Sequence, residues 1–363
     1  MKIFEIIPQM TSGGAERFVL DLCNELSKSH DVYLIVFFTP SSKAYYVEEL
    51  NTNVKLISLD KKKGFSFRIF LLLYKLINEH SPDIIHTHIE AISYIFPYPL
   101  IFCKAQFYHT LHSDAYFEAS SRSRRLLRKI LFSLKLVKPI TISNGSHKSF
   151  CELYGMNTPV IPNGRRFPEK ICPSIDAVEE MRKIRRLGGR VVICPARFCS
   201  VKRHELTARV AKKLHDEGIK FQMVFMGSIS ETEIVDRINE ISATNVHIIG
   251  EKCNPLDYMA LSDAYCLFSE CEGLPISLIE AISIPLIPIC TPVGGIPEII
   301  TPEVGFLSED ITEDSCFNAL KEYLLTPDAH LSKYKQHARN TSSTFNIEQC
   351  AKFYEILFLN TRV

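Results

Sequence analysis

The sequence has 363 residues, enough for two domains of ordinary size that each bury a core of their own. Hydrophobic residues make up 46% of the chain and charged residues 23%, which excludes a disordered or fibrous protein. The net charge of +1 hides a basic excess in residues 1–165 and an acidic excess in residues 166–363. Only the first half is therefore expected to meet an anionic surface.

The twelve cysteines form no CxxC pair and lie mostly within apolar runs, which indicates buried, reduced thiols in a cytosolic protein. No cysteine–histidine cluster has the spacing of a metal site. The chain starts directly with a strand-like pattern, and no uncharged apolar run approaches the length of a membrane span. We therefore expect a cytoplasmic protein without a signal peptide.

In both halves, short β-rich apolar runs alternate with longer amphipathic stretches, a pattern typical of a parallel sheet covered by helices. A turn at Pro162-Asn163-Gly164 and a polar stretch to about Pro173 indicate a linker between two doubly wound α/β domains. Strands are expected at 2–8, 31–38, 54–59, 83–88, 105–111, 139–143, 159–162, 190–195, 220–226, 245–249, 263–268 and 286–290. Helices are expected at 15–28, 65–79, 121–138, 144–153, 203–217, 230–240, 255–261, 275–284 and 346–360.

Polar residues follow the strand expected at 263–268, in the segment Ser269-Glu270-Cys271-Glu272-Gly273-Leu274-Pro275-Ile276. In open parallel sheets, ligands bind outside the carboxyl ends of the strands. Pro275 suits the first position of a helix, whose free N–H groups form an anion site. The carboxylates of Glu272 and Glu280 would accept hydrogen bonds from sugar hydroxyls. The pattern predicts a pocket for a phosphate that carries sugars.

The Glu-x7-Glu spacing inside Ser-x-x-Glu-Gly-x-Pro resembles the signature of the retaining GT-B glycosyltransferases of family 4. The segment Thr291-Pro292-Val293-Gly294-Gly295-Ile296-Pro297-Glu298-Ile299 is similar to that family's T-x-x-G-G-x-x-E-[IL] loop. The resemblance covers both halves and implies two Rossmann-like domains facing an interdomain cleft. Residues 1–165 would bind the acceptor and 166–345 the nucleotide sugar, with the final helix, 346–363, packing back on the first domain. The implied donor-binding residues here are Gly273, Leu274, Pro275, Ile276 and Glu280.

Two glycine-containing turns are also candidates for donor binding. Gly13-Gly14 follows the first strand and opens a helix, although such a pair is often plain turn chemistry. Within Gly13-Gly14-Ala15-Glu16-Arg17 it resembles the family's G-G-x-E-R loop, which lies near the donor diphosphate. Backbone groups around Gly250, in the segment 247–252, are expected to hold the nucleotide base.

Two cations, Arg197 and Lys202, lie five residues apart on the loop after the strand at 190–195. They resemble the family's G-R-x-x-x-x-K-G motif, with both glycines replaced, by Ala196 and Arg203. A solvated basic loop is the alternative. Fixed cations would stabilise the charge that develops on a departing diphosphate. Because the sequence contains no Asp-x-Asp motif, these cations are expected to replace a metal, and no metal or other cofactor is predicted.

Histidines end two strands of the first half. The segment Asp83-Ile84-Ile85-His86-Thr87-His88 resembles the family's P-D-[IV]-[IV]-H-x-H strand, for which a structural role and a site role are both open. In the segment Phe107-Tyr108-His109-Thr110-Leu111-His112, His112 matches the family histidine that approaches the transferred sugar. A satisfied core histidine is the alternative.

The segment 121–138 combines seven basic residues and no acidic one with apolar residues at helical spacing. This is typical of a basic amphipathic helix on anionic lipid, peripheral to the inner face of the cytoplasmic membrane. The alternative is a helix that packs on the core and exposes a solvated basic face.

Together these features predict a metal-independent retaining glycosyltransferase, with Arg197, Lys202, Glu272 and His112 as catalytic residues. The donor would be a nucleoside-diphosphate sugar, a UDP-sugar first and GDP-mannose second. The acceptor would be a glycan or lipid-linked saccharide of bacterial surface polysaccharide, and no nucleic acid is expected as a partner. The alternatives are a sugar-nucleotide epimerase on the same plan and a non-catalytic partner subunit.

Overall fold

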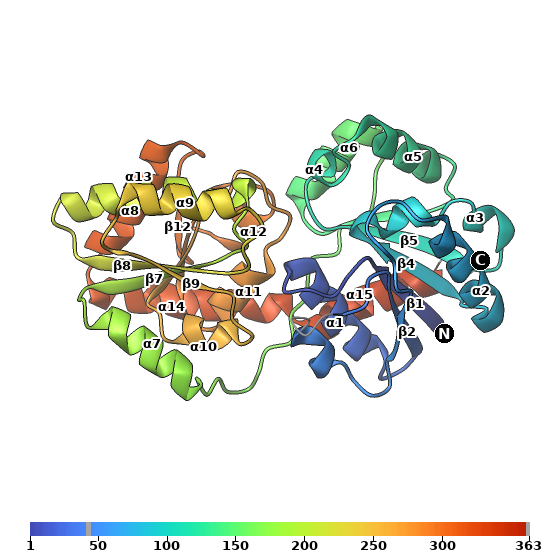
Figure 1. Cartoon of the computed structure of the whole chain (residues 1–363), viewed down its shortest axis with the longest axis horizontal. Helices are drawn as coiled ribbons and strands as arrows, with labels where there is room; N and C mark the ends of the chain where they lie inside the picture. The colour runs from blue at the N-terminus through green and yellow to red at the C-terminus, as the bar shows by residue number, and fades with distance from the viewer. Residues whose placement is uncertain (41–44, 361–363) are drawn as a thin grey trace. The chain divides into compact units, whose positions relative to one another are not determined.

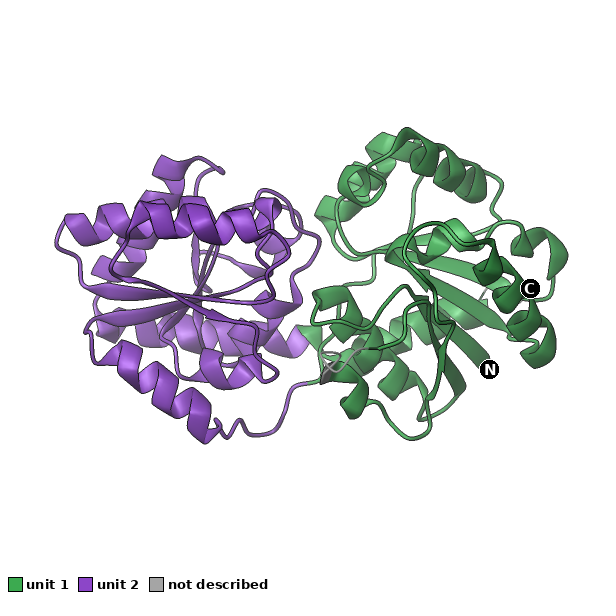
Figure 2. Ribbon diagram, in the orientation of Figure 1, with its two compact units in different colours: residues 1–166, 345–363 green, residues 167–344 purple. Residues whose placement is uncertain are grey.

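The computed structural model describes residues 1–40 and 45–360. The chain divides into two compact units (Figure 2). Unit 1 comprises Met1–Arg166 and the segment that begins at Phe345, and unit 2 comprises Phe167–Thr344. Each unit contains one six-stranded parallel sheet with helices on both faces (Figure 1). The predicted α/β class, with one doubly wound sheet in each half, is confirmed.

The sheet of unit 1 has the order β3-β2-β1-β4-β5-β6, and its strand order reverses between β1 and β4. Side chains alternate between the two faces of each strand. Phe4, Ile6 and Ile85 lie in the hydrophobic core on one face, and Glu5 and His86 take the intervening positions. The strands are β1 (Lys2–Ile7), β2 (Asp31–Val36), β3 (Lys55–Ser58), β4 (Ile84–His88), β5 (Gln106–Leu111) and β6 (Lys138–Thr141).

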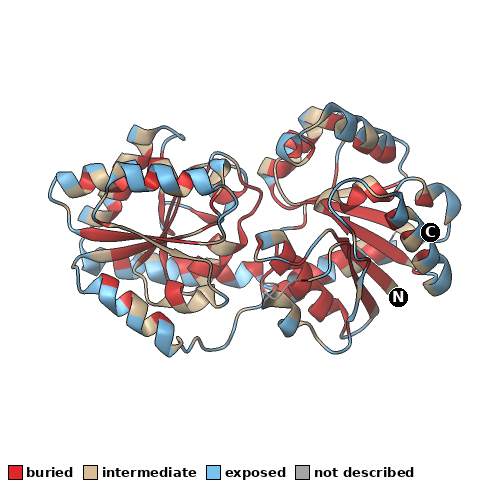
Figure 3. Cartoon of the chain, viewed as in Figure 1, coloured by how far each residue is buried: buried red, intermediate tan, exposed pale blue. Residues whose placement is uncertain are grey.

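The helices of unit 1 bury apolar residues against both faces of this sheet, while their outer sides stay exposed (Figure 3). They are α1 (Gly14–Leu26), α2 (Phe67–His80), α3 (Tyr98–Ile101), α4 (Ala115–Glu118), α5 (Arg122–Ser133), α6 (Asn144–Tyr154) and α15 (Ile347–Asn360), with the short 3-10 turns η1 (Tyr45–Glu49) and η2 (Ile89–Tyr94).

Two elements predicted for unit 1 are wrong. The helix expected at 121–138 ends at Ser133, because Lys135 takes a left-handed backbone conformation (φ 54°) and the chain turns into β6. The strand expected at 159–162 is reduced to one bridge between Thr141 and Val160. Prolines on both sides of Val160 lack the N–H that a longer ladder would need.

The sheet of unit 2 has the order β12-β11-β10-β7-β8-β9. The sequence analysis did not predict β12, α7, α12, α13 or α14. The strands are β7 (Arg190–Pro195), β8 (Phe221–Met226), β9 (Val246–Gly250), β10 (Ala264–Leu267), β11 (Ile287–Cys290) and β12 (Phe306–Leu307). The helices are α7 (Ile175–Arg185), α8 (His204–Asp216), α9 (Thr232–Ile241), α10 (Pro255–Ala260), α11 (Ile276–Ser283), α12 (Ile296–Ile299), α13 (Glu313–Leu325) and α14 (Asp328–Ser342), with the 3-10 turns η3 (Ser200–Lys202) and η4 (Ser343–Phe345), the latter at the boundary with unit 1. Within residues 1–40 and 45–360, no helix is both long and apolar enough to cross a membrane.

Candidate active site

The loops after β7 and β10 bring a lysine and a glutamate together in unit 2. The ammonium of Lys202 lies 2.5 Å from Glu272 Oε1, and the Ser269 hydroxyl donates to the same oxygen over 2.5 Å. The Glu272 side chain is 7% exposed, whereas that of Lys202 is 24% exposed. Because β7 and β10 are neighbours in the sheet, the ends of these two strands place the two charges side by side. The arrangement is a partly open charged pair at the edge where parallel sheets bind ligands.

The loop after β11 closes tightly over the Glu272 loop. A Cβ atom on Gly294 would lie 2.0 Å from the Glu272 carbonyl oxygen, and Gly294 has a φ of +58°. The Gly295 N–H donates to the Gly273 carbonyl over 2.6 Å, and the Thr291 hydroxyl donates to the Ser269 carbonyl over 2.7 Å. A glycine is required at Gly294 for both conformation and space. These contacts hold the backbone around Glu272 in one shape.

The other site residues predicted on these loops lie outside the Lys202–Glu272 pair. Arg197 is exposed after β7 and is not part of the Lys202–Glu272 pair. Glu280 is 8% exposed on α11, and the preceding Pro275 caps that helix, which begins at Ile276. Pro275 is therefore the N-cap and not, as predicted, the first helical residue. Leu274 and Ile276 are buried.

The basic loop keeps a backbone conformation that favours glycine at one of the two positions where the family motif has a glycine. Arg203, which stands where the motif has its second glycine, takes the left-handed conformation with φ 53°. Its guanidinium donates to the Ile311 carbonyl over 2.6 Å. Gly250 ends β9 with φ +71°, and its carbonyl accepts a hydrogen bond from the Gly227 N–H over 2.9 Å. The ends of β8 and β9 are thereby joined.

The turn after β1 in unit 1 is folded around Glu16. Helix α1 begins at Gly14, and a Cβ atom on Gly13 would lie 2.2 Å from Glu16 Oε2. The Thr11 hydroxyl donates to Glu16 Oε1 over 2.9 Å. Glu16 thus sits in the first turn of α1, where the helix dipole favours a negative charge.

Strand alternation separates the histidines of unit 1 into two groups. His86 and His88 point to the same face as Glu5, and His112 follows β5 by one residue on that face. His88 Nδ1 lies 2.9 Å from His112 Nε2, and His88 Nε2 lies 2.7 Å from Glu5 Oε2. Burial lowers the pKa of His112 to about 4, so its ring is neutral at pH 7. The sequence analysis did not identify Glu5, a lone carboxylate in an apolar strand.

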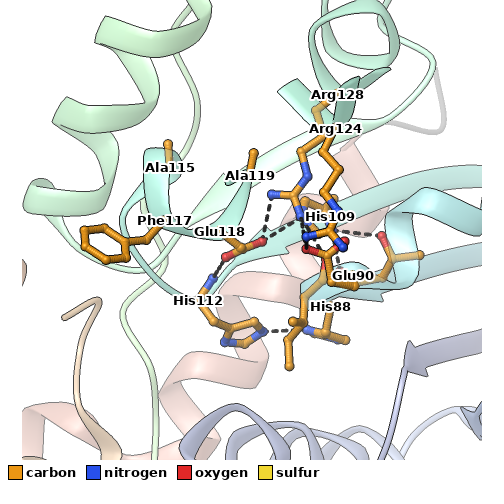
Figure 4. A network of polar contacts seen from close by, with 12 residues as sticks. His88, Glu90, His109, His112, Ala115, Phe117, Glu118, Ala119, Arg124 and Arg128 are labelled. Atoms are coloured by element: carbon orange, nitrogen blue, oxygen red, sulfur yellow. Dashed lines mark hydrogen bonds and ion pairs between the residues drawn. The ribbon is translucent and has the colours of Figure 1, made fainter. Parts of the chain in front are cut away.

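His109 points to the opposite face, into a buried charged cluster around Glu118 (Figure 4). Glu118 Oε1 lies 3.0 Å from Arg128 Nη1 and 3.2 Å from His109 Nε2. Its other oxygen accepts a hydrogen bond from the His112 backbone N–H over 2.7 Å. Burial opposes ionisation of Glu118, but Arg128 and His109 outweigh it and lower its pKa to about 2. Arg128 therefore belongs to the interior and not to the basic face that was expected of this helix.

Each half of the sequence matches a family model. Residues 12–166 match the model described as Glycosyltransferase Family 4, and residues 177–341 match the model described as Glycosyl transferases group 1. Together the two matches leave only the ends of the chain and the segment 167–176 outside. The resemblance to family 4 glycosyltransferases, predicted from motifs in both halves of the chain, is therefore confirmed.

Curated relatives extend over most of the chain. The sequence is 27% identical over 354 residues to the UDP-Gal:alpha-D-GlcNAc-diphosphoundecaprenol alpha-1,3-galactosyltransferase of Escherichia coli, covering 93% of this chain and 86% of the relative. It is 24% identical to the capsular polysaccharide biosynthesis glycosyltransferase CapH of Staphylococcus aureus, covering 77% of this chain and 78% of the relative.

Solved structures share the fold over nearly the whole length. The sucrose-phosphate synthase of Thermosynechococcus elongatus is similar with a TM-score of 0.82 at 17% identity, covering 99% of this chain and 100% of that one. Anabaena HepE, in complex with UDP and glucose, is similar with a TM-score of 0.80 at 18% identity, with the same coverage. At this identity the likeness establishes the GT-B fold of this chain.

Proposed function

Because this chain belongs to the family 4 type of glycosyltransferases with GT-B fold, we propose that it transfers a sugar from a UDP-sugar to a lipid-linked saccharide. GDP-mannose is the second choice of donor, and the pathway would be bacterial surface polysaccharide assembly. The Lys202–Glu272 pair at the carboxyl ends of β7 and β10 carries the proposal. The relative from E. coli supports the choice of donor and acceptor, since its name specifies UDP-Gal and a diphosphoundecaprenol acceptor.

The proposed reaction needs positive charge where the diphosphate departs. As the bond between the sugar and the phosphate breaks, negative charge develops on the leaving diphosphate, and Lys202 and Arg197 would stabilise it without a metal. The acceptor oxygen forms its bond on the same face of the sugar, and the departing phosphate oxygen takes the acceptor's proton. Glu272 and Glu280 would accept hydrogen bonds from donor hydroxyls. The configuration at the transferred carbon would be retained.

A thermal-shift panel of UDP, GDP, ADP and CMP, run in EDTA, tests the donor class. A ligand at 100 times its Kd stabilises the folded state by about 2.7 kcal/mol, which is a shift of several degrees. We expect the largest shift with UDP, with inorganic pyrophosphate as the control for charge alone. A larger shift with GDP would favour GDP-mannose. If none of these nucleotides shifted the melting temperature, the proposal would be contradicted.

Turnover of the matching nucleotide sugars in EDTA then separates the alternatives. Release of nucleotide that depends on a lipid-linked saccharide, with retention at the transferred carbon by proton NMR, is the expected result. Conversion of the donor without an acceptor would indicate the epimerase, and binding without any turnover would indicate a non-catalytic subunit. Activity that is lost in EDTA and restored by Mg²⁺ would contradict metal independence.

Helix α5 supports a peripheral contact with anionic lipid. Its Leu131 and Phe132 are buried, whereas Leu126, Ile130 and Leu134 are 61%, 41% and 64% exposed. A helix that only packs on the core would not repeat exposed apolar residues at a spacing of four. Four basic residues in and just after the helix are exposed as well: Arg122, Arg124, Lys129 and Lys135. Apolar and basic groups exposed together are typical of interfacial helices.

Changing Arg122, Lys129 and Lys135 to Gln should weaken co-sedimentation with anionic vesicles. Each cation near such a surface is worth about 1 kcal/mol, so each loss should lower the affinity roughly fivefold. The matched control removes three exposed basic residues of α14, Lys333, Lys335 and Arg339. If both triple variants lost the same amount of vesicle binding, the net charge of the protein would explain the loss, and a specific role for α5 would be contradicted.

A further inference from the structure

A line of buried polar contacts in unit 1 ends at His112. It starts at Glu5 on β1, continues through His88 on β4 and reaches His112 just after β5, three neighbouring strands of the sheet. The Glu5 and His88 side chains are fully buried. Figure 4 shows the last step, the contact between the His88 and His112 rings.

A second set of contacts, the side branch, leads from Glu5 at the start of this line through His86 to Tyr354. His86 Nδ1 lies 2.9 Å from the same Glu5 oxygen that His88 contacts. His86 Nε2 lies 2.7 Å from the Thr110 hydroxyl, which lies 3.0 Å from the hydroxyl of Tyr354 on α15. His112 is held by its backbone bond to Glu118 and by the Phe18 ring, 5.6 Å from its own ring.

Glu5, His86 and His88 have the residue types of a metal site, but their ligand atoms lie closer together than around a tetrahedral zinc ion. Ligand atoms about 2.05 Å from a tetrahedral zinc ion lie about 3.3 Å apart. The Glu5 oxygen is 2.7 Å from His88 Nε2 and 2.9 Å from His86 Nδ1. Both distances are shorter than a tetrahedral zinc site allows. The His88 contact has the geometry of a hydrogen bond, and the His86 contact does not.

The burial of Glu5 favours a neutral carboxyl. Its Oε1 has no hydrogen-bond partner among the described residues, and an ionised carboxylate buried in this way would be strongly disfavoured. Burial raises the pKa of Glu5, against the opposing effect of its contact with His88, and burial lowers the pKa values of His86 and His88. A neutral Glu5 donates its O–H to His88 Nε2. His88 then donates from Nδ1 to His112 Nε2, which leaves the proton of His112 on Nδ1.

We propose that Glu5, acting through His88, is a positioning residue that fixes His112 as the Nδ1–H tautomer and presents this N–H to an oxygen of the bound sugar. His112 Nδ1 is buried and has no partner within the described part of the chain. A buried donor without an acceptor is unfavourable, and a ligand oxygen would remove that cost. That the ligand is a sugar donor rests on the proposed function, whereas the tautomer depends on this chain alone.

Nitrogen-15 NMR of the histidine-labelled protein, without any ligand, tests the tautomer. The His112 signals are identified by their loss in His112→Asn. We expect a proton on Nδ1 of His112 in the wild type, and a shift to Nε2–H in Glu5→Leu, where His88 Nε2 has lost its donor. His88→Phe keeps a ring in place and should also remove the Nδ1–H preference if Glu5→Leu fails to fold. A proton on Nε2 in the wild type, or no change in either variant, overturns the proposal.

Kinetics test the positioning role. Misplacing a reacting group by about 1 Å can cost roughly 100-fold in rate, so kcat should fall by that order in Glu5→Leu and His88→Phe, with UDP binding unchanged. Glu5→Gln should keep kcat within about threefold, because its amide N–H can donate to His88 Nε2 as a neutral carboxyl does.

Tyr354→Phe is the matched control, since it removes a buried hydroxyl from the side branch and keeps the ring. It should keep kcat within about threefold. If Tyr354→Phe lost as much activity as Glu5→Leu, or if Glu5→Gln were as inactive as Glu5→Leu, the role of Glu5 would be general packing and the proposal overturned. If the wild type turned over no donor, the proposed function would fail, and the NMR result would still decide the tautomer.

Discussion

Replacing Lys202 by methionine should lower kcat by a factor of 100 to 1,000 and leave the fold intact. Removal of one preorganised group that stabilises developing negative charge costs about that much in other enzymes. The Lys202 side chain is 24% exposed, so the loss of its pair with Glu272 is partly compensated by solvent. The melting temperature should fall by no more than about 4 °C. Steady-state kinetics with the donor found in the thermal-shift panel, together with thermal unfolding, checks both parts.

Two further variants sharpen this test. Glu272→Ala should also abolish transfer with little change in melting temperature, because Glu272 would bind the donor. Lys213→Met is the control, since Lys213 on α8 also forms an ion pair, with Glu313 on α13 at 2.7 Å. It should keep full activity. A large drop in melting temperature in Lys202→Met would instead indicate that the Lys202–Glu272 pair is structural.

Helices and strands could be predicted from the sequence where the apolar residues formed a clear pattern. Apolar runs of four to six residues gave β7, β10 and β11 within one residue, because buried parallel strands are apolar on both faces. The end of α5 could not be predicted, since Leu136 and Val137 continue the apolar pattern while the backbone has already turned. Helix α14 was missed because its apolar positions are few: of its residues, Leu331, Ala338 and Ser342 are buried.

The candidate site could be predicted only in part, for a physical reason. Motif spacing found Lys202 and Glu272, 70 residues apart, but their contact depends on the pairing of β7 with β10. Glu5, Glu118 and Arg128 carry no motif. Glu5 contacts His88, 83 residues further along the chain, whereas Glu118 and Arg128 are only 10 residues apart and are brought together by the fold of α4 and α5. The roles assigned to the site residues stay predictions, for Lys202, Glu272 and His112 as well as for Arg197, Glu280 and the glycines of the two turns.

The second large effect concerns stability: Arg128→Met should lower the free energy of unfolding by about 3 to 5 kcal/mol at pH 7. Arg128 is 1% exposed, pairs with Glu118 and donates to the Ile89 carbonyl over 3.1 Å. Removal of one partner from a buried pair leaves the other charge uncompensated, which is where costs of this size arise. Urea unfolding of the wild type and the variant measures the difference.

The loss should shrink in acid. The pKa of Glu118 is lowered to about 2, so its stabilising contribution is complete above its ordinary pKa of 4.5 and declines as the pH falls toward 2. Without Arg128 the pKa of Glu118 rises, and the carboxyl can become neutral in the folded variant at a higher pH. The difference between wild type and Arg128→Met should therefore be smaller at pH 4 than at pH 7.

One turn earlier on the same helix, Arg124 provides the matched control. It is 46% exposed and lies 3.1 Å from Glu90, so Arg124→Met should cost no more than about 1 kcal/mol. Adding Glu118→Gln to Arg128→Met removes the stranded charge and should restore part of the lost stability. Equal losses in the two arginine variants, or no recovery in the double variant, would mean that packing and not the buried charge pair holds α4 and α5 to the sheet. The Arg128–Glu118 pair also helps to position His112, because Glu118 accepts a hydrogen bond from the His112 backbone N–H.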